Sequence, residues 1–347
     1  MAVVKPSKSS DITAKNHHSP VTLPIALDAM GGDFAPDQII EGARLARDSG
    51  INVVLVGQPD ALADAGFPII EASEVIAMDA DPGSSVRTMK DSSLVRAAEA
   101  VRDGNASAMV SAGNTGATMA SALLRMKRMK GVARPAIAAT LPIPDSDRRN
   151  LLLDAGANSE CQPEWLVQFA RMGAAYHRSL HAVETPRVGL LSIGEEASKG
   201  SPFVKDTHKL LTAPEWQAAA GCTFVGNVEG RDLLSDDVDV VVTDGFTGNV
   251  ALKTLEGTAK ALVDALLVAF GSSEDAQKGA ELLLPALAPL YQRLDPDNIG
   301  GAALLGVRGL CIISHGSSSA KAISHALRVA NELVERDTIA SIAESLN

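Results

Sequence analysis

The segment that most constrains the fold runs from Asp239 to Lys253. It begins with an uninterrupted β-branched run at 240–242, which is typical of a strand buried on both faces of a parallel sheet. A glycine turn follows, and apolar residues then recur at helical spacing from Leu252 onward. A strand, a glycine turn and a helix N-terminus in this order present backbone N–H groups and a positive dipole end to an anion.

The same unit recurs along the chain, so strands alternate with helices. This alternation predicts an α/β protein with a doubly wound, mostly parallel sheet. Strands are expected at 25–28, 52–56, 75–78, 108–111, 137–141, 151–153, 188–193, 224–228, 240–242 and 310–314. Helices are expected at 37–48, 92–101 and 115–130, after Pro163 and Pro202, and up to about residue 335, with a loop at 81–85.

Residues 1–22 are polar and lack the apolar core of a signal peptide, so we expect a disordered N-terminal tail. Residues 23–335 are expected to form a single α/β catalytic domain, and residues 336–347 a C-terminal tail. Within the domain, 247–294 contains two helical patterns and no strand, which predicts a helical hairpin arm standing off the sheet. Pro285 and Pro289 should kink or stagger its return limb.

The first helix of this arm carries an apolar stripe, and a stripe with no sheet beneath it must find another apolar surface. The stripe consists of Leu252, Leu255, Ala259, Leu262, Val263, Leu266, Leu267 and Phe270. The same arm of a second subunit is the commonest partner, so we expect a homodimer. Lipid is the alternative, but the acidic Glu274 and Asp275 at the tip would be repelled by an anionic leaflet. We therefore expect weak membrane contact, through 282–284.

The composition disfavours nucleic-acid binding, because aromatic residues make up 3% of the chain and its formal net charge is −11. Cys161, Cys222 and Cys311 are isolated, which is typical of reduced thiols in a cytoplasmic protein. No apolar run is long enough to suggest a membrane-spanning helix.

Ligands of open parallel sheets bind beyond the carboxyl ends of the strands, and several glycine turns with neutral polar neighbours fall there. A single glycine after a strand more often only permits a tight turn, but the set together suits a phosphate-sized anion. The candidate phosphate- or substrate-binding residues are Asp28, Gly31, Gly32, Asn114, Thr115, Asn158, Thr247, Gly248, Asn249 and Ser317.

Other ligand motifs are missing. The sequence has no GxGxxG dinucleotide fingerprint, no GxSxG, no HExxH and no paired CxxC. The segment 194–201 is similar to a P-loop, but Lys199 and Gly200 are transposed, which argues against a nucleoside triphosphate. His177 and His181 have a spacing that could hold zinc, but no third ligand accompanies them, so no metal site is expected.

The sequence offers no obvious protein nucleophile, which is informative if inorganic phosphate itself attacks an activated acyl group. The protein would then only hold phosphate, position the carbonyl and stabilise the oxyanion. A thioester fits, because a thiol with a pKa of about 8.5 leaves readily. The candidate catalytic residues are Lys199, His315 and Asp244.

The aspartates at strand ends have other interpretations. Asp28, Asp154 and Asp244 could cap helices, or orient Lys199, Lys253 or Lys321. They could also hold Mg²⁺ against an acidic substrate. His315 could protonate a leaving group or simply end a strand.

A basic cluster at Arg125, Lys127, Arg128 and Lys130 contains no acidic residue. It could complement the dipole at a helix C-terminus, or it could dock an acidic partner. Both interpretations stay open.

Taken together, the motifs resemble a known family. They are IALDAMGGD (25–33), SAGNTGA (111–117), RPAI (134–137), LLDAGAN (152–158), GLLSIGEE (189–196), GNVEG (226–230), TDGFTGN (243–249), GGAALLG (300–306) and HGSS (315–318). In this order they closely resemble the PlsX family, the phosphate acyltransferases of bacterial phospholipid synthesis. The resemblance covers roughly residues 23–335.

The resemblance implies a reaction of acyl-[acyl carrier protein] with inorganic phosphate that yields acyl phosphate. It implies no cofactor, a homodimer of phosphotransacetylase- or isocitrate-dehydrogenase-like fold, and a hairpin linked to dimerisation and membrane contact. The basic cluster at 125–130 is our own candidate for the carrier-protein dock, because the carrier protein is acidic. The enzyme would be cytoplasmic or peripheral at the inner face of the membrane, and a membrane glycerol-phosphate acyltransferase would follow it.

Two departures from the family pattern stand out. The family commonly has Asp-Ala-Arg after the HGSS motif, whereas this chain has Ser319-Ala-Lys321, so no acidic role carries over there. The hairpin tip is also less basic and less apolar than lipid contact would require. Two competing classes are a dehydrogenase-like or metal-using α/β enzyme and a non-catalytic module that binds carrier protein.

Overall fold

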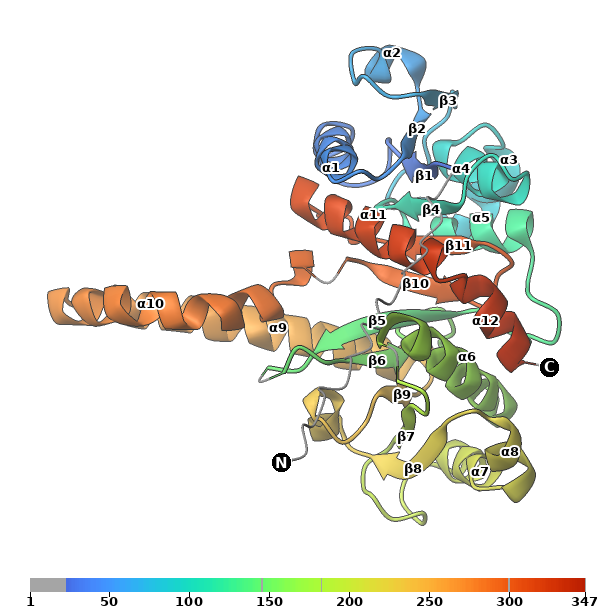
Figure 1. Ribbon diagram of the computed structural model, residues 1–347, viewed down its shortest axis with the longest axis vertical. Helices are drawn as coiled ribbons and strands as arrows, with labels where there is room; N and C mark the ends of the chain where they lie inside the picture. Colours follow the sequence, from blue (N-terminus) through green and yellow to red (C-terminus); the bar gives the residue numbers. More distant parts are fainter. Residues whose placement is uncertain (1–22, 145, 182, 299, 347) are drawn as a thin grey trace, which may run out of the picture.

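The computed structural model describes residues 23–144, 146–181, 183–298 and 300–346. In these ranges eleven strands form one sheet in the order β3-β2-β1-β4-β11-β10-β5-β6-β9-β7-β8, with helices on both faces (Figure 1). The strands are β1 (Ile25–Asp28), β2 (Val53–Gly57), β3 (Ile69–Glu71), β4 (Ala108–Ser111), β5 (Ala136–Pro142), β6 (Arg149–Leu153), β7 (Arg187–Leu191), β8 (Thr223–Val228), β9 (Val240–Val242), β10 (Ala302–Leu305) and β11 (Leu310–Ile313).

The α-helices are α1 (Asp37–Asp48), α2 (Pro59–Leu62), α3 (Pro82–Thr88), α4 (Ser93–Arg102), α5 (Thr115–Met126), α6 (Pro163–His181), α7 (Pro202–Leu211), α8 (Pro214–Ala219), α9 (Gly245–Phe270), α10 (Glu274–Leu294), α11 (Ala320–Glu335) and α12 (Thr338–Ser345). Two 3₁₀ turns, η1 (Gly230–Leu234) and η2 (Pro296–Asn298), complete the described elements.

The sheet is mostly parallel and doubly wound, as predicted, but its direction reverses in the middle. Strands β3, β2, β1, β4 and β11 run parallel to one another. Antiparallel pairs join β11 to β10, β10 to β5 and β5 to β6. Strands β6, β9, β7 and β8 are again mutually parallel. The two outer parts of the sheet therefore run in opposite directions, which the sequence analysis did not predict.

Side-chain alternation explains how one sheet supports two hydrophobic clusters. Ile25 and Leu27 of β1 pack into a cluster with helices α1, α6 and α11, whereas Ala26 packs into a cluster with α4 and α5. Both sides of β1 are fully buried. This explains why the strands are short, uninterrupted apolar runs rather than alternating ones.

Several predicted boundaries differ from the structure. The strand expected at 75–78 is absent from the described residues there, and β3 lies earlier, at Ile69–Glu71. The loop expected at 81–85 is part of α3, which Asp81 caps by accepting a hydrogen bond from the Ser84 N–H at 2.8 Å. Helix α5 ends at Met126 rather than near 130, because Lys127 adopts a φ of 67° and breaks the helix.

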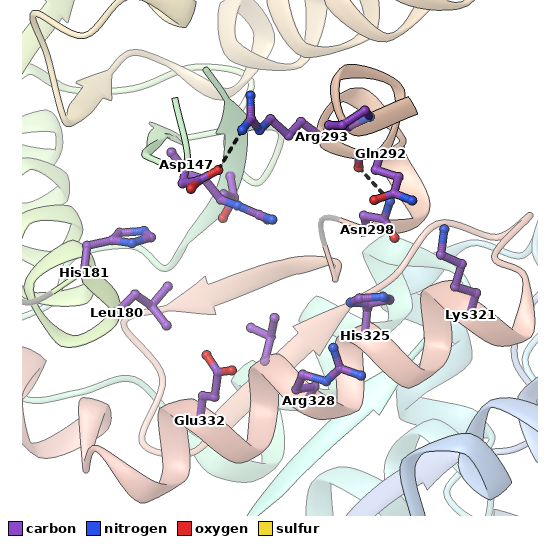
Figure 2. Close-up of a pocket in the computed structure, with 14 residues that line it drawn as sticks. Asp147, Leu180, His181, Gln292, Arg293, Asn298, Lys321, His325, Arg328 and Glu332 are labelled. Carbon is purple, nitrogen blue, oxygen red and sulfur yellow. Dashed lines mark hydrogen bonds and ion pairs between the residues drawn. The ribbon is translucent and has the colours of Figure 1, made fainter. Parts of the chain in front are cut away.

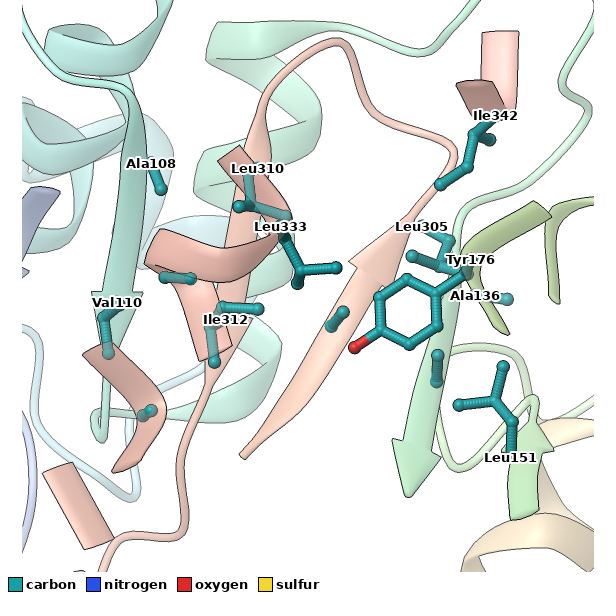
Figure 3. Close-up of a cluster of buried hydrophobic side chains, with 14 of the residues drawn as sticks. Ala108, Val110, Ala136, Leu151, Tyr176, Leu305, Leu310, Ile312, Leu333 and Ile342 are labelled. Atoms are coloured by element: carbon teal, nitrogen blue, oxygen red, sulfur yellow. The ribbon is translucent and has the colours of Figure 1, made fainter. Parts of the chain in front are cut away.

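Two further elements were missed. The four-residue strand β10 lies between β5 and β11, in a segment that the sequence analysis assigned to no element. The segment 336–347, expected as a tail, contains helix α12, which packs against α6 and buries Ile342 in the main hydrophobic cluster (Figure 3).

The hairpin arm is present as predicted. Helices α9 and α10 lie alongside each other and project away from the sheet (Figure 1). Helix α10 continues through Pro285 and Pro289. Large apolar side chains on the arm are exposed, including Leu262 at 59%, Val268 at 76% and Leu282 at 83%. Among the described helices, none combines the length and hydropathy needed to cross a membrane.

Candidate active site

The candidate residues fall into two groups at the carboxyl ends of the two halves of the sheet. The first group follows β1, β4 and β11, and the second follows β6, β9 and β7. Within the described residues, hydrogen bonds join members of each group, but none joins the two groups.

Asp28 is the buried centre of the first group. Its carboxylate accepts hydrogen bonds from Ser111 Oγ at 2.7 Å and from the Met30 N–H at 3.2 Å. Burial raises the pKa of Asp28, and these hydrogen bonds oppose the rise. A Cβ on Gly31 would lie 2.4 Å from Asp28 Oδ2 and 2.8 Å from the Gly113 Cα, so this turn requires glycine.

Asn114 is occupied by the fold rather than free for a ligand. Its side-chain amide donates to the carbonyl oxygens of Met78 at 2.8 Å and Ala80 at 3.1 Å. Its Oδ1 caps α5 by accepting from the Ala117 N–H at 2.9 Å. The prediction that Asn114 supplies a phosphate donor is therefore corrected, because both of its amide hydrogens already have acceptors. The neighbouring Thr115 is exposed.

His315 and Ser317 form an exposed pair at the end of β11. The Ser317 hydroxyl lies 2.8 Å from His315 Nδ1, and the Ser317 N–H donates to the same nitrogen at 3.3 Å. Because Nδ1 accepts these bonds, the neutral imidazole carries its proton on Nε2. His315 can therefore donate a hydrogen bond outward from this turn.

Asp154 is the corresponding centre of the second group. Its Oδ1 accepts from the backbone N–H groups of Ile137, Gly156 and Ala157, and its Oδ2 from the N–H and side-chain amide of Asn158. Burial raises the pKa of Asp154, and these bonds oppose the rise. The side-chain amide of Asn158 also donates to the Pro135 carbonyl at 2.8 Å, so Asn158 belongs to the same internal network.

Asp244 caps helix α9. Its carboxylate accepts from the Thr247 N–H and from Thr247 Oγ1, each at 2.8 Å. The Gly245 N–H donates to the Asn158 carbonyl at 2.7 Å, and the Gly248 N–H to the Asp244 carbonyl at 2.9 Å. These N–H groups are therefore not available to an anion, although the dipole of the 26-residue helix still points at this turn.

Asn249 and Lys199 are the candidates in this group whose polar ends are free. Asn249 is exposed, and its side chain lies close to Gly156. A Cβ placed on Gly156 would be 3.6 Å from the Asn249 side chain. Lys199 is exposed in the turn after β7. Within the described ranges, neither the Asn249 amide nor Lys199 Nζ has a hydrogen-bond or ion-pair partner.

The strand-end aspartates do not orient the lysines. Lys253 pairs with Glu256 at 2.7 Å, and Lys321 pairs with Asp295 at 2.9 Å. Ser319, which departs from the family pattern, donates its hydroxyl to Asp297. The turn before α11 thus has two carboxylates beside it, although neither comes from the motif itself.

The two groups border one hydrophobic cluster. It contains Ala155 from the second group's loop and Ala117 from the helix that the first group begins.

Two supporting residues were missed by the sequence analysis. Ser111 holds the Asp28 carboxylate, and Asn227 holds the turn that carries Lys199 by donating to the Glu196 carbonyl at 3.0 Å. Asn227 is buried, and its Oδ1 lies 2.9 Å from His208 Nδ1. The signal available in the sequence was an asparagine near the end of the strand expected at 224–228.

The basic cluster after α5 is only partly free. Arg128 donates to the carbonyl oxygens of Val132 and Ala133, and Arg125 lies 3.7 Å from Glu99. Lys127 and Lys130 are exposed. The cluster borders a hollow of about 580 Å³. This hollow is lined by Leu123, Lys127, Arg128, Ala133, Arg134 and Trp165.

No metal site is assembled from the residues that the structure describes. The rings of His177 and His181 lie 4.5 Å apart, but no third His, Cys, Asp or Glu joins them. Asp28 belongs to one group and Asp154 and Asp244 to the other, so these three carboxylates do not gather around one ion.

Comparisons with known proteins agree along nearly the whole chain. A family model described as "Fatty acid synthesis protein" matches residues 23–341. The phosphate acyltransferase of Heliobacterium modesticaldum is 47% identical over 93% of this chain and 97% of its own length. That of Elusimicrobium minutum is 46% identical over 93% of this chain and 95% of its own length.

Solved structures support the fold. The EutD phosphotransacetylase from Staphylococcus aureus superposes with a TM-score of 0.60 at 14% identity, covering 92% of this chain and 96% of that chain. A branched-chain phosphotransacylase from Enterococcus faecalis V583 gives a TM-score of 0.61 at 16% identity, covering 90% and 99%.

The packing of α9 against the loop after β6 generates a stability prediction. A Cβ on Gly248 would lie 1.9 Å from the Asp154 carbonyl oxygen, whereas Gly257, also in α9, has nothing within 4 Å. We expect Gly248→Ala to lower the free energy of unfolding by about 3 kcal/mol through overpacking. The control Gly257→Ala should raise it by up to about 1 kcal/mol, because alanine favours the helix. Urea unfolding measures both, and equal stabilities would show that the α9 start is loosely packed.

Proposed function

This chain belongs to the fatty acid synthesis protein family whose curated relatives are phosphate acyltransferases, and we propose that its acyl donor is an acyl-[acyl carrier protein]. The products are acyl phosphate, which supplies phospholipid synthesis, and free carrier protein. The assignment rests on the 47% sequence identity to a phosphate acyltransferase over 93% of the chain. The fold supports it, because it is also that of enzymes whose names describe acyl transfer to phosphate.

The chemistry is a displacement at a thioester. A phosphate oxygen attacks the carbonyl carbon, a C–O bond forms, and the C–S bond breaks with its electron pair going to sulfur. The thiolate leaves and takes up a proton to become a thiol. The protein needs no nucleophile of its own, so its task is to hold phosphate, orient the thioester and stabilise the oxyanion.

We assign phosphate binding to the second group. The Asn249 amide and the Lys199 ammonium are free polar ends there, and the positive end of the α9 dipole points at the same turn. Asp244 acts as a positioning residue in this proposal, because it fixes the first turn of α9 through Thr247. Gly248 permits the close approach of that turn to Asp154.

We assign the thioester side to the first group. The His315 Nε2–H can donate a hydrogen bond to the leaving sulfur as negative charge develops on it, with Ser317 fixing the ring. Gly31 and Gly32 form the tight turn beside it, where the Gly316 carbonyl accepts from the Asp33 N–H at 2.8 Å. This role requires the substrate to bridge the two groups.

The proposed activity has a direct test. The protein, a long-chain acyl-carrier protein and inorganic phosphate are incubated, and acyl phosphate is trapped with hydroxylamine as the acyl hydroxamate. Hydroxylamine also attacks thioesters slowly, so the same mixture without phosphate is the reference. Phosphate-dependent hydroxamate supports the proposal. Its absence, with the carrier protein merely bound, would support a non-catalytic carrier-binding module.

The phosphate assignment predicts a specific kinetic loss. Asn249→Ala should raise the phosphate KM or lower kcat at least about tenfold, which is about 1.4 kcal/mol of lost anion or oxyanion stabilisation. Steady-state kinetics with varied phosphate measure it. Asn114→Ala is the matched control: it removes the α5 cap and should lower stability by about 1 kcal/mol while leaving the phosphate KM unchanged. Normal phosphate kinetics in Asn249→Ala would remove this turn from the site.

The carrier protein is an acidic partner in our proposal, and its dock is the basic cluster after α5. Lys127 and Lys130 are its free charges, whereas Arg128 is bound to backbone carbonyls. Lys127→Glu with Lys130→Glu should raise the KM for the acyl carrier and leave the phosphate KM alone, with a steep dependence on ionic strength in the unchanged protein. Arg44→Glu on α1 is the control for net charge. If neither ionic strength nor the two lysine substitutions changes the KM for the acyl carrier, these residues are only a solvated helix end.

We further propose that two chains pair through the α9 stripe and that membrane contact is weak. Leu262 is 59% and Leu266 is 42% exposed, and the arm has no sheet beneath it. Acyl phosphate is reactive, so a membrane glycerol-phosphate acyltransferase that consumes it should act nearby, at the inner face of the membrane. Peripheral contact would involve Leu282, Leu283 and Leu284, which are all exposed.

The pairing predicts an assembly phenotype. Leu262→Glu combined with Leu266→Glu should give monomer or aggregate in sedimentation, because each substitution places an unpaired charge in an apolar interface. Lys260→Glu, off the stripe, is the control and should leave the dimer intact. A clean dimer in the double variant that has lost liposome binding would show instead that the stripe faces lipid.

A further inference from the structure

A hollow of about 780 Å³ lies between α11 and the end of α6, and none of the candidate catalytic residues lines it. Figure 2 shows its walls: Lys321, His325, Arg328 and Glu332 along α11, Leu180 and His181 from α6, and Gln292 and Arg293 from α10. Arg149, at the start of β6, also lines it. We call it the α6–α11 hollow.

The hollow lies on the face of the sheet opposite the cluster that the two candidate groups flank. Helices α6 and α11 pack into the cluster that contains Leu27, whereas Ala117 and Ala155 belong to the cluster on the other face. A ligand in the hollow would therefore be distinct from the phosphate that the candidate site holds.

Basic side chains outnumber acidic ones in this hollow, and part of the basic charge is unpaired. Arg293 is neutralised by Asp147 at 3.1 Å, and Lys321 by Asp295 at 2.9 Å. Across the described ranges, Arg149 and Arg328 have no ion-pair partner. Glu332 also lines the hollow and has no ion-pair partner in those ranges, so the two arginines exceed it by one positive charge. The hollow therefore keeps a net positive potential.

The two histidines that line the hollow lie near the same basic side chains. Burial lowers the pKa of His181 to about 4, and the charges of His177, Arg149 and Arg336 add to the effect, with Asp239 opposing it. Burial also lowers the pKa of His325, helped by Arg328, Lys321 and Arg149 and opposed by Asp295. Arg149 lines the same hollow as both histidines, of which one lies on α6 and the other on α11.

We propose that the α6–α11 hollow binds an organic phosphate ester, with Arg149 and Arg328 pairing its phosphate group. Arginine forks match phosphate oxygens in two parallel hydrogen bonds, and such bonds are among the strongest that a protein makes. The volume is that of a site for a small organic molecule rather than for a bare ion. Leu180 and Val329 provide apolar wall for the organic part, and neutral His325 can donate one hydrogen bond.

Such a ligand would connect the two halves of the sheet. Helix α11 packs on β11, β4 and β1, whereas Arg149 opens β6 and α6 packs on β6 and β9. A phosphate group held by Arg149 and Arg328 at once would bind one arrangement of the halves better than others. By linkage, it would shift the population toward that arrangement.

The test is equilibrium binding of AMP to the full-length protein, measured by titration calorimetry at low ionic strength. Adenosine is the uncharged counterpart and inorganic phosphate the anion without an organic part. AMP should bind saturably and more tightly than either. Arg149→Gln and Arg328→Gln should each weaken AMP at least about tenfold, or about 1.4 kcal/mol. Arg102→Gln, on α4 outside the hollow, is the matched control and should bind normally.

Arg328 is exposed on α11, so Arg328→Gln should remain folded, and its melting temperature verifies this. Asn249→Ala separates this site from the catalytic one and should leave AMP binding unchanged. The proposal is overturned if AMP does not bind, if adenosine binds equally well, or if both arginine variants keep normal affinity. It is equally overturned if Asn249→Ala abolishes binding, since AMP would then occupy the catalytic turns.

Discussion

The buried carboxylate of Asp154 is the interaction on which the second half of the structure depends. Removing a carboxylate from water is costly, and here the cost is offset by hydrogen bonds from Ile137, Gly156, Ala157 and Asn158. These bonds tie the start of β5 to the loop after β6. The Asp154 carbonyl then packs against Gly248 so closely that no side chain fits, so the same residue also fixes where α9 begins. The direction of the arm therefore follows from one strand end.

This arrangement also decides what the site can offer an anion. The N–H groups of Gly245, Thr247 and Gly248 are all satisfied internally, so the turn presents a helix dipole and the Asn249 side chain rather than a row of free donors. The donors of the first group are also satisfied internally, because the Asn114 side-chain amide donates to the carbonyl oxygens of Met78 and Ala80. Most polar groups in both sets of turns therefore hydrogen-bond within the protein. The few that do not are the best candidates for binding substrate.

The sequence alone predicted the fold class and most strands, because buried parallel strands are short apolar runs and turns contain glycine. The reversal of the sheet was not predicted, because β10 was assigned to no element and the direction of the strand pairs was not considered. The short connections 143–148 and 306–309 each allow only an antiparallel pair between neighbouring strands. Lys127 broke α5 through a backbone conformation that its residue type does not signal. Asn114 and Asn249 both stand in glycine turns at strand ends, yet only the hydrogen-bond partners distinguish the occupied amide from the free one.

The hairpin arm contributes both to the proposed dimer contact, through α9, and to the wall of the α6–α11 hollow, through α10. Its second helix, α10, carries Gln292 and Arg293 in its last turn, and these two residues form one wall of the α6–α11 hollow. Arg293 forms an ion pair there with Asp147, just before β6, at 3.1 Å. If the exposed stripe of α9 pairs with a second chain, that contact fixes the arm and with it the wall of the hollow. Pairing and phosphate-ester binding would then favour the same arrangement, and each would strengthen the other by the same factor.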